Sequence, residues 1–203
     1  MPVRDRNGGI MDVKQAIEKR RAYRAFDPVE ITDAMMQDLA SAAQLTASCF
    51  NNQPWKFVFA KSPEALAKVG ACLSKGNEWA LRSSLIIAAF AKKENDCVIK
   101  EREYYLFDLG MAVSALLLRA TEMGLAAHPI AGFDNEKVRQ VLGIPEGNMV
   151  ITLINVGKKS ADVSGLNAYQ SAQDTGPRPA RLPLESIYAV DSYNEKLAVK
   201  PAR

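Results

Sequence analysis

The chain has 203 residues, and its 26 Lys or Arg against 23 Asp or Glu give a formal net charge of +3. Hydrophobic residues make up 48% and charged residues 24%, an ordinary globular balance that excludes a largely disordered chain and a disulfide scaffold. The longest apolar run, at 85–91, has seven residues, far fewer than the roughly 20 that a membrane helix needs. The net charge is too small to indicate nucleic acid by itself, so we expect neither a membrane nor a nucleic acid as a partner.

The cysteines and the histidine restrict the chemistry that we expect. Cys49, Cys72 and Cys97 form no C-x-x-C pair, and such a sparse, odd set is typical of a protein from the reducing cytoplasm. The first residues contain no apolar stretch of the secretory kind, which also favours a cytoplasmic location. His128 is the single histidine, so a His-based metal cluster cannot form, and we predict no metal site. A Ser-His-Asp triad would depend on His128 alone.

Capping signals predict the first two helices. Asp12 followed by Gln15 has the spacing of a capping box, and the helix that it begins carries the basic cluster at 19–24 in its last turn, where positive charge suits the helix dipole. The Phe-Asp-Pro sequence at 26–28 ends this helix. Thr32 is a second N-cap, and the residues after it show an apolar stripe with helical spacing.

The middle of the chain alternates strands and helices. A strand is predicted at 55–61, and the Ser-Pro that follows it opens a helix that runs to about residue 73. The continuous apolar run at 85–91 is typical of a buried strand. From 101 to 123 the chain is apolar nearly all round, which predicts a central helix buried on most sides and ended by Gly124. The remaining predicted elements are a strand at 125–130, a helix at 135–142 and a strand at 149–156.

The two ends of the chain differ from its middle. Residues 1–11 are predicted to be a loose N-terminal leader, and residues 12–159 to form the folded domain. Residues 160–203 hold few periodic apolar positions and four of the ten prolines. Because a compact domain seldom contains a loop of this length without structure, we interpret 160–203 as a C-terminal arm that packs on a second copy of the chain.

Two common nucleotide-binding motifs are missing from the sequence. It contains neither the G-x-G of the dinucleotide fingerprint nor the G-x-x-x-x-G-K-[ST] of a P-loop. Two other segments are recognisable. IEKRRAYRAF at 17–26 resembles the N-terminal flavin motif of the FMN-dependent nitroreductase family, and ASCFNNQPW at 47–55 resembles the Asn-x-Gln-Pro-Trp loop of that family. Further matches, in the order of the family, lie at 108–110, 116–125, 129–145, 156–157 and 178–184.

The resemblance implies a fold and an activity. It implies an α+β fold with a mostly antiparallel sheet flanked by helices, a buried central helix and an extended C-terminal arm. It implies an intimate homodimer with two FMN sites at the dimer interface. It also implies ping-pong chemistry, in which NAD(P)H transiently binds and reduces FMN, and FMN then reduces a flat, electron-poor compound such as a nitroaromatic or a quinone.

The resemblance also assigns roles to the arginines. The phosphate of FMN carries about −1.5 to −2 charges, and the planar guanidinium group offers it two parallel donors. By similarity Arg20 and Arg181 bind this phosphate, with Arg21 and Arg178 beside them. Arg24 matches the basic residue at the pyrimidine end of the flavin ring, where a fixed cation stabilises the reduced ring. The alternative is a solvated helix end with exposed salt bridges, which is what most such clusters are.

Four residues depart from the family pattern. Pro179 stands where a lysine is frequent, and Arg178 can substitute for that lysine. Ala22 stands where Ser is common, and it lacks the hydroxyl that would add a phosphate hydrogen bond worth about 0.5–1.5 kcal/mol. Ala131 stands where many relatives carry Glu. Cys49 stands where Ser is frequent, and we interpret it as an inert small residue because no second cysteine is nearby in sequence. The other cofactor-binding residues implied by the resemblance are Ser48, Asn51 and Gln53, which reach FMN largely across the dimer interface, together with Asn77, Pro129, Ile130, Ala131 and Gly132.

Other functions remain open at this level. A specialised branch of the family, which fragments flavin or removes halogens, usually carries an added lid, and none is evident between 60 and 108. A flavin-binding sensor or store would bind FMN without turnover. A basic dimeric module without flavin would bind RNA or acidic partners. We expect an NAD(P)H-dependent flavin oxidoreductase in which the flavin, rather than a protein side chain, carries the chemistry.

Overall fold

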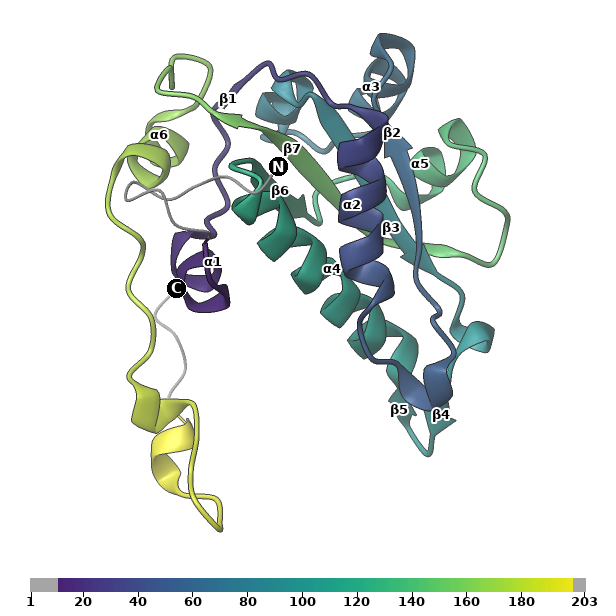
Figure 1. Ribbon diagram of the computed structural model, residues 1–203, viewed down its shortest axis with the longest axis vertical. Helices are drawn as coiled ribbons and strands as arrows, with labels where there is room; N and C mark the ends of the chain where they lie inside the picture. Colours follow the sequence, from purple (N-terminus) through teal and green to yellow (C-terminus); the bar gives the residue numbers. More distant parts are fainter. Residues whose placement is uncertain (1–10, 199–203) are drawn as a thin grey trace.

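Five antiparallel strands form the central sheet of the computed structural model, which describes residues 11–198 (Figure 1). The longest strand, β7 (Met149–Lys159), pairs with β3 (Leu85–Ala91), with β6 (Ala126–Ile130) and with β1 (Phe26–Asp27). The strand β2 (Lys56–Ala60) pairs with the other side of β3. The prediction of an α+β fold with a mostly antiparallel sheet is therefore confirmed.

Helices cover both faces of this sheet. One apolar cluster joins α2 and α4 to one face, and a second joins α3 and α5 to the other. A short hairpin, β4 (Val98–Ile99) and β5 (Arg102–Glu103), precedes α4. The helices are α1 (Val13–Lys19), α2 (Asp33–Gln44), α3 (Pro63–Gly70), α4 (Tyr104–Glu122), α5 (Asn135–Val141) and α6 (Ala168–Thr175).

The strand β3 explains why both clusters form. All seven of its residues are buried, and successive side chains of a strand point to opposite faces of the sheet. Leu85 and Ile87 belong to the cluster with α2 and α4, whereas Ile86 and Phe90 belong to the cluster with α3 and α5. A strand buried on both faces needs a continuous apolar sequence rather than an alternating one, as the run at 85–91 indicated.

The capping predictions at Asp12 and Thr32 are confirmed. Each side chain accepts the backbone N–H of the residue three positions later, at the beginning of α1 and α2, and Asp134 caps α5 in the same way. The central helix α4 is buried along one side and through its middle, while Leu106 and Phe107 in its first turn are 44% and 61% exposed. Among residues 11–198, no helix combines the length and the apolar character needed to cross a bilayer.

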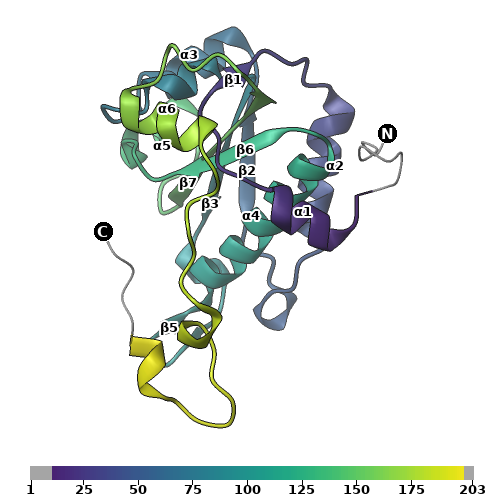
Figure 2. The ribbon, with the colours of Figure 1, turned by 90° about the vertical axis from the view of Figure 1, so that its left-hand side faces the viewer.

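The C-terminal arm differs from its prediction. Residues 160–175 pack on their own chain, where they include α6, and only the residues after α6 extend away from the sheet and its helices (Figures 1 and 2). This extended part contains two short turns of 3₁₀-helix, at Leu184–Ser186 and Glu195–Ala198. Residues 1–10 of the predicted leader and 199–203 of the predicted arm lie outside the described residues.

His128 is a packed core residue. Its side chain on β6 is 8% exposed, and its ring stacks on Trp79 with 4.7 Å between the ring centroids. Its Nδ1 lies 3.0 Å from the carbonyl oxygen of Tyr23, to which the neutral imidazole donates. Burial lowers the pKa of His128 to about 4. The ring is therefore neutral at pH 7, and we interpret His128 as a packed residue rather than an acid.

We expect His128 to make the stability of the fold depend on pH. The unfolded chain takes up a proton near pH 6.5, but the folded chain resists it down to about pH 4, so the free energy of unfolding falls as the pH falls through this window. Between pH 7 and pH 5 this loss should be about 2 kcal/mol. Urea unfolding of the wild type and of His128→Gln at both pH values measures it. Equal losses in the two proteins would contradict the assignment.

Candidate functional site

The basic cluster after α1 is extended rather than helical. The sequence predicted that it forms the last turn of the first helix, and this is wrong: α1 ends at Lys19, and Arg20 has φ −54° and ψ 123°. The reason is tertiary, because backbone groups of this segment bond to distant side chains instead of to a further helical turn. Arg178 donates to the carbonyl oxygen of Arg20 at 2.6 Å. Asp174 accepts the backbone N–H of Arg24 at 2.7 Å.

The segment from α6 to Arg178 lies against this extended segment (Figure 2). The guanidinium of Arg21 donates to three carbonyl oxygens at the C-terminal end of α6, where a cation also suits the helix dipole. Two of these bonds are 2.8 Å to Gly176 and 3.0 Å to Pro177. Arg178 donates in the opposite direction, to the carbonyl oxygen of Glu18 at 2.6 Å. These two arginines therefore hold the beginning of the arm against the end of α1.

A cavity rich in positive charge opens between the two segments. Its lining residues are Arg20, Arg21, Ala22, Arg24, Gln173, Arg178, Pro179 and Arg181. Within residues 11–198, no salt bridge involves Arg20, Arg178 or Arg181. Burial, followed by the positive charges of Arg178 and Arg181, lowers the pKa of Arg20. An anion in this cavity would neutralise that charge, and guanidinium groups suit a phosphate in particular.

Arg24 lines the same cavity but already has a counter-charge. Its Nη1 donates to Oε1 of Gln173 at 3.0 Å and lies 3.8 Å from Oδ1 of Asp174. Asp174 is only 4% exposed. The guanidinium also lies 6.0 Å from the ring centre of Trp79. Arg24 is therefore a fixed cation with a defined position, which distinguishes it from Arg20.

Sequence reasoning missed α6, and with it Gln173 and Asp174. A signal was available, because Asn167 and Gln170 have the spacing of a capping box and form one in the structure. The helix is only eight residues long and largely polar, so the apolar periodicity that revealed the longer helices is too weak here.

A second group of predicted residues lies next to the beginning of α6. Nδ2 of Asn77 donates to the carbonyl oxygen of Gly132 at 3.1 Å, and Gln170 on α6 donates to the carbonyl oxygen of Gly76 at 2.9 Å. A Cβ on Gly132 would lie 2.2 Å from the Asn77 amide, so this close approach requires glycine. Of the other residues predicted here, Pro129 is half-buried, Ile130 is buried and Ala131 is exposed.

The predicted loop residues Ser48, Asn51 and Gln53 do not line the arginine cavity of their own chain. The loop that contains them lies beside the β4–β5 hairpin, far along the molecule from α1 and α6 (Figure 1). Oγ of Ser48 accepts the backbone N–H of Gln53 at 3.0 Å, and Nε2 of Gln53 donates to Oδ1 of Asn51 at 3.2 Å. Within one copy of the chain, the loop and the cavity are separate.

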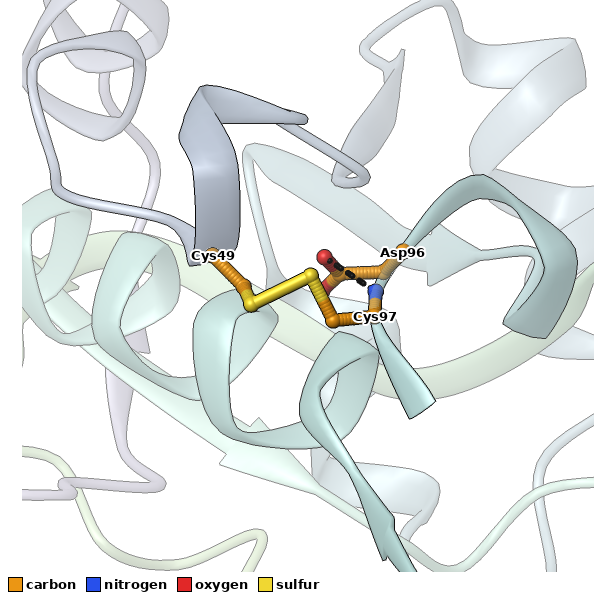
Figure 3. Close-up of side chains that lie close together, drawn as sticks. All are labelled: Cys49, Asp96 and Cys97. Atoms are coloured by element: carbon orange, nitrogen blue, oxygen red, sulfur yellow. Dashed lines mark hydrogen bonds between the residues drawn. A yellow bond between two sulfur atoms is a disulfide. The ribbon is translucent and has the colours of Figure 1, made fainter. Parts of the chain in front are cut away.

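Cys49 differs from its interpretation as an inert, isolated residue, which is wrong. It forms a disulfide with Cys97, 48 residues further along the chain (Figure 3). The fold brings together two cysteines that are distant in sequence, because the loop after α2 lies against the segment before β4. Asp96 adjoins the pair, and its carboxylate and the two sulfurs lie within 4.8 Å of one another. Both thiols of this group of possible metal ligands are used by the disulfide.

The chain was compared with known proteins and solved structures. The model of the Nitroreductase family matches residues 17–158. YdgI of Bacillus subtilis (strain 168), provisionally named an NAD(P)H nitroreductase, is 26% identical, and the match covers 87% of this chain and 96% of YdgI. A solved structure described as an oxidoreductase containing FMN is 25% identical, with a TM-score of 0.78 over 88% of this chain and 91% of that one. A nitroreductase family protein from Clostridium novyi NT is 25% identical, with a TM-score of 0.70 over 74% and 87%.

The family match includes most of the features that the sequence singled out. It covers the basic segment, the 47–55 loop, the central helix and nearly all of β7. The structural matches extend the agreement to the arrangement of the sheet and its helices. The resemblance recognised in the sequence is thus confirmed, and the chain belongs to the nitroreductase family.

Proposed function

We propose that the arginine cavity holds the phosphate of FMN, and that the chain passes a hydride from NAD(P)H through this flavin to flat, electron-poor acceptors such as nitroaromatics and quinones. The family and YdgI support an NAD(P)H-dependent oxidoreductase, and the related structure that contains FMN supports the cofactor. The observation that carries the proposal is the cavity itself, where five arginines gather and, among residues 11–198, only Arg24 has an ion-pair partner while the other four have none.

Each arginine has its own role in this proposal. Arg20 and Arg181 bind the phosphate oxygens, because both line the cavity and neither forms a salt bridge within residues 11–198. Arg21 and Arg178 already donate to backbone carbonyl oxygens, so they hold the two walls together. Arg24 contacts the pyrimidine end of the flavin ring, because Gln173 and Asp174 fix its guanidinium at one side of the cavity.

Residues along α6, from the cavity to the segment at 129–132, would hold the flavin ring. Gln173 near the end of α6 bonds to Arg24, and Gln170 near its beginning bonds to Gly76, so the helix connects the two groups of residues. Asn77 would contact the edge of the ring. The loop with Ser48, Asn51 and Gln53 would contact the ring from a second copy of the chain, because it does not line the cavity of its own chain.

The reaction divides between the cofactor and the protein. Bound FMN supplies the ring that accepts the hydride and later donates it. Arg24 provides a fixed positive charge where reduction places negative charge, which favours the reduced form of the ring. His128 is neutral and buried, so it does not supply a proton, and water takes that role.

The functional unit in this proposal is a homodimer. Beyond α6 the arm carries large apolar side chains that are each at least 60% exposed, and a second copy would cover them. These side chains belong to Leu184, Ile187, Tyr188, Val190 and Tyr193.

An anaerobic visible spectrum of the purified protein tests the function. The protein should show the absorption of oxidised flavin, NADH or NADPH should bleach it, and a quinone should restore it. The cofactor released by acid should chromatograph as FMN, because the cavity encloses one terminal phosphate. Bound flavin that neither nucleotide bleaches would contradict an oxidoreductase, and a protein that takes up no flavin would refute the cavity assignment.

The arginine variants should fail in two different ways. Arg20→Ala and Arg181→Ala each remove a charge-assisted hydrogen bond worth about 1.5–3 kcal/mol, so FMN should bind about tenfold to a hundredfold more weakly. Excess FMN should largely restore their turnover. Arg24→Ala should lower the flavin reduction potential and slow flavin reduction even when FMN is saturating.

Titration with FMN measures the affinity for the cofactor, and dye equilibration measures the flavin reduction potential. The two measurements separate these effects. Arg82→Ala is the matched control, because it removes an arginine whose exposed salt bridge to Asp162 lies outside the cavity. Unchanged FMN affinity in Arg20→Ala would refute the phosphate role. Recovery of the wild-type potential by Arg24→Ala at saturating FMN would refute the ring role.

Ala22→Ser should tighten FMN binding. Ala22 lines the cavity, and a hydroxyl there adds one hydrogen bond to the phosphate, worth about 0.5–1.5 kcal/mol or about twofold to tenfold in affinity. Fluorescence titration measures the dissociation constant, with Ala34→Ser on the exposed face of α2 as the control. The same affinity in both variants would mean that the backbone at Ala22 does not face the phosphate.

Charge on the arm should weaken the dimer. Leu184→Glu combined with Ile187→Glu places two carboxylates where the proposed partner would bury apolar side chains, and burying unpaired charge is costly. Sedimentation velocity should show a dimer for the wild type and a larger monomer fraction for the double variant at equal concentration. A wild type that sediments as a monomer while retaining FMN would show that one copy is sufficient.

A further inference from the structure

The disulfide between Cys49 and Cys97 lies at the base of the loop with Ser48, Asn51 and Gln53. Cys49 is the second residue of this loop, and Cys97 directly precedes β4, so the bond ties the loop to the hairpin (Figure 3). Both cysteines are partly exposed, whereas a disulfide deep in the core would be out of reach of small reagents. The pair is therefore accessible to thiol–disulfide chemistry.

The loop has a backbone conformation that needs external support. Phe50, Asn51 and Gln53 have φ of 48°, 59° and 49°. Non-glycine residues in this region cost about 1–3 kcal/mol each, and they persist only where surrounding contacts hold them. Phe50 is also 88% exposed, so its side chain contributes little packing within the chain. The loop depends on the contacts at its two ends.

Those contacts are made with the segment that contains Cys97 and with α4. The backbone N–H of Cys49 donates to Oδ2 of Asp108 at 2.7 Å, at the beginning of α4. Nδ2 of Asn52 donates to Oδ1 of Asp96 at 3.2 Å. The disulfide is the covalent member of this set, and breaking it leaves only hydrogen bonds to hold the loop against the backbone cost.

Asp96 can stabilise the opened pair. Its Oδ1 accepts the backbone N–H of Cys97 at 2.8 Å, while its Oδ2 is buried and has no hydrogen-bond partner among residues 11–198. This carboxylate lies within 4.8 Å of both sulfurs. Because a thiol is a weak donor and a disulfide sulfur is none, opening the bond adds a donor within 4.8 Å of this carboxylate. The site thus accommodates a closed and an open state.

We propose that Cys49 and Cys97 form a reversible redox site, closed by hydroperoxides and opened by dithiols, whose closed form holds the loop in the shape that binds flavin. The inference rests on the proposed function, because the contact between this loop and FMN is part of that proposal. Redox state would then control the affinity for the cofactor.

Both steps balance. In opening, a dithiol gives two electrons and two protons: its own thiols become a disulfide, and the bond between Cys49 and Cys97 becomes two thiols. In closing, the thiolate of one cysteine attacks the terminal oxygen of a hydroperoxide, the O–O bond breaks, and an alcohol leaves. The second thiol then attacks the resulting sulfenic acid, the S–S bond forms and water leaves.

The test measures the loop and the cofactor separately in the full-length protein. Wild type, the Cys49→Ser/Cys97→Ser double variant and Cys72→Ser are treated with dithiothreitol or with hydrogen peroxide, and intact mass after alkylation establishes the state of each. Cys72→Ser is the matched control, since Cys72 is a buried free thiol outside the pair. FMN fluorescence gives the dissociation constant, and hydrogen exchange followed by mass spectrometry gives the protection of residues 48–53.

Opening the disulfide should speed hydrogen exchange at residues 48–53 in the wild type and in Cys72→Ser. If about one open chain in ten keeps the binding shape, the dissociation constant for FMN should rise about tenfold. The double variant should respond to neither reagent. Equal affinity and equal exchange in wild-type protein whose disulfide has opened would overturn the proposal, as would a disulfide that never forms with peroxide. If neither the open nor the closed form binds FMN, the proposed function is refuted, and with it the expected change in FMN affinity. The hydrogen-exchange data still decide whether the disulfide holds the loop.

Discussion

The buried carboxylate of Asp174 is the interaction on which the geometry of the arginine cavity depends. It is 4% exposed, and its Oδ2 accepts the backbone N–H groups of Arg24 and Ala25 at 2.7 and 2.8 Å. A buried charge is costly unless hydrogen bonds and a counter-charge compensate it, and the guanidinium of Arg24 is that counter-charge. These bonds keep the segment after α1 extended and fix α6 beside it. If the segment after α1 were not extended, or if α6 were not fixed beside it, the arginines would not share one cavity.

The same arrangement concentrates charge on a chain that has little of it overall. The formal net charge is +3, yet five arginines line one cavity. Repulsion among them is part of the reason for the lowered pKa of Arg20, together with burial. A ligand that binds only the folded chain also stabilises it, so a bound phosphate would strengthen the contact between the arm and the end of α1. Cofactor binding and the position of the arm would be coupled in this way.

The arginine cavity and the 48–53 loop are far apart within one copy of the chain, and the proposed dimer follows from this separation. Each copy of the chain presents the arginine cavity between α6 and the end of α1, and the loop beside the β4–β5 hairpin. Exposed apolar side chains lie on the arm, at Phe50 and at Phe107. Two copies would complete each other's sites. The cysteine pair lies at the base of the loop that one copy would offer to the other, so the dimer, the flavin and the disulfide would form one coupled equilibrium.

Local signals in the sequence determined most of the secondary structure and the identity of the site. The caps at Asp12, Thr32 and Asp134, the apolar run at 85–91 and the long apolar helix need only neighbouring residues, because their hydrogen bonds and faces repeat within a few positions. The family motifs are equally local, and they selected the arginines that the structure gathers in one cavity.

Contacts between residues that are distant in sequence decided the end of α1 and the pairing of Cys49. The end of α1 at Lys19 depends on bonds to the region of Asp174 and Arg178, about 150 residues away, so the basic run alone favoured a longer helix. The partner of Cys49 is 48 residues away, and spacing along the chain could not identify it. A sequence records which groups can bond, but only the folded chain brings Cys97 to Cys49, because the energy of each contact depends on where the rest of the chain has placed its partner.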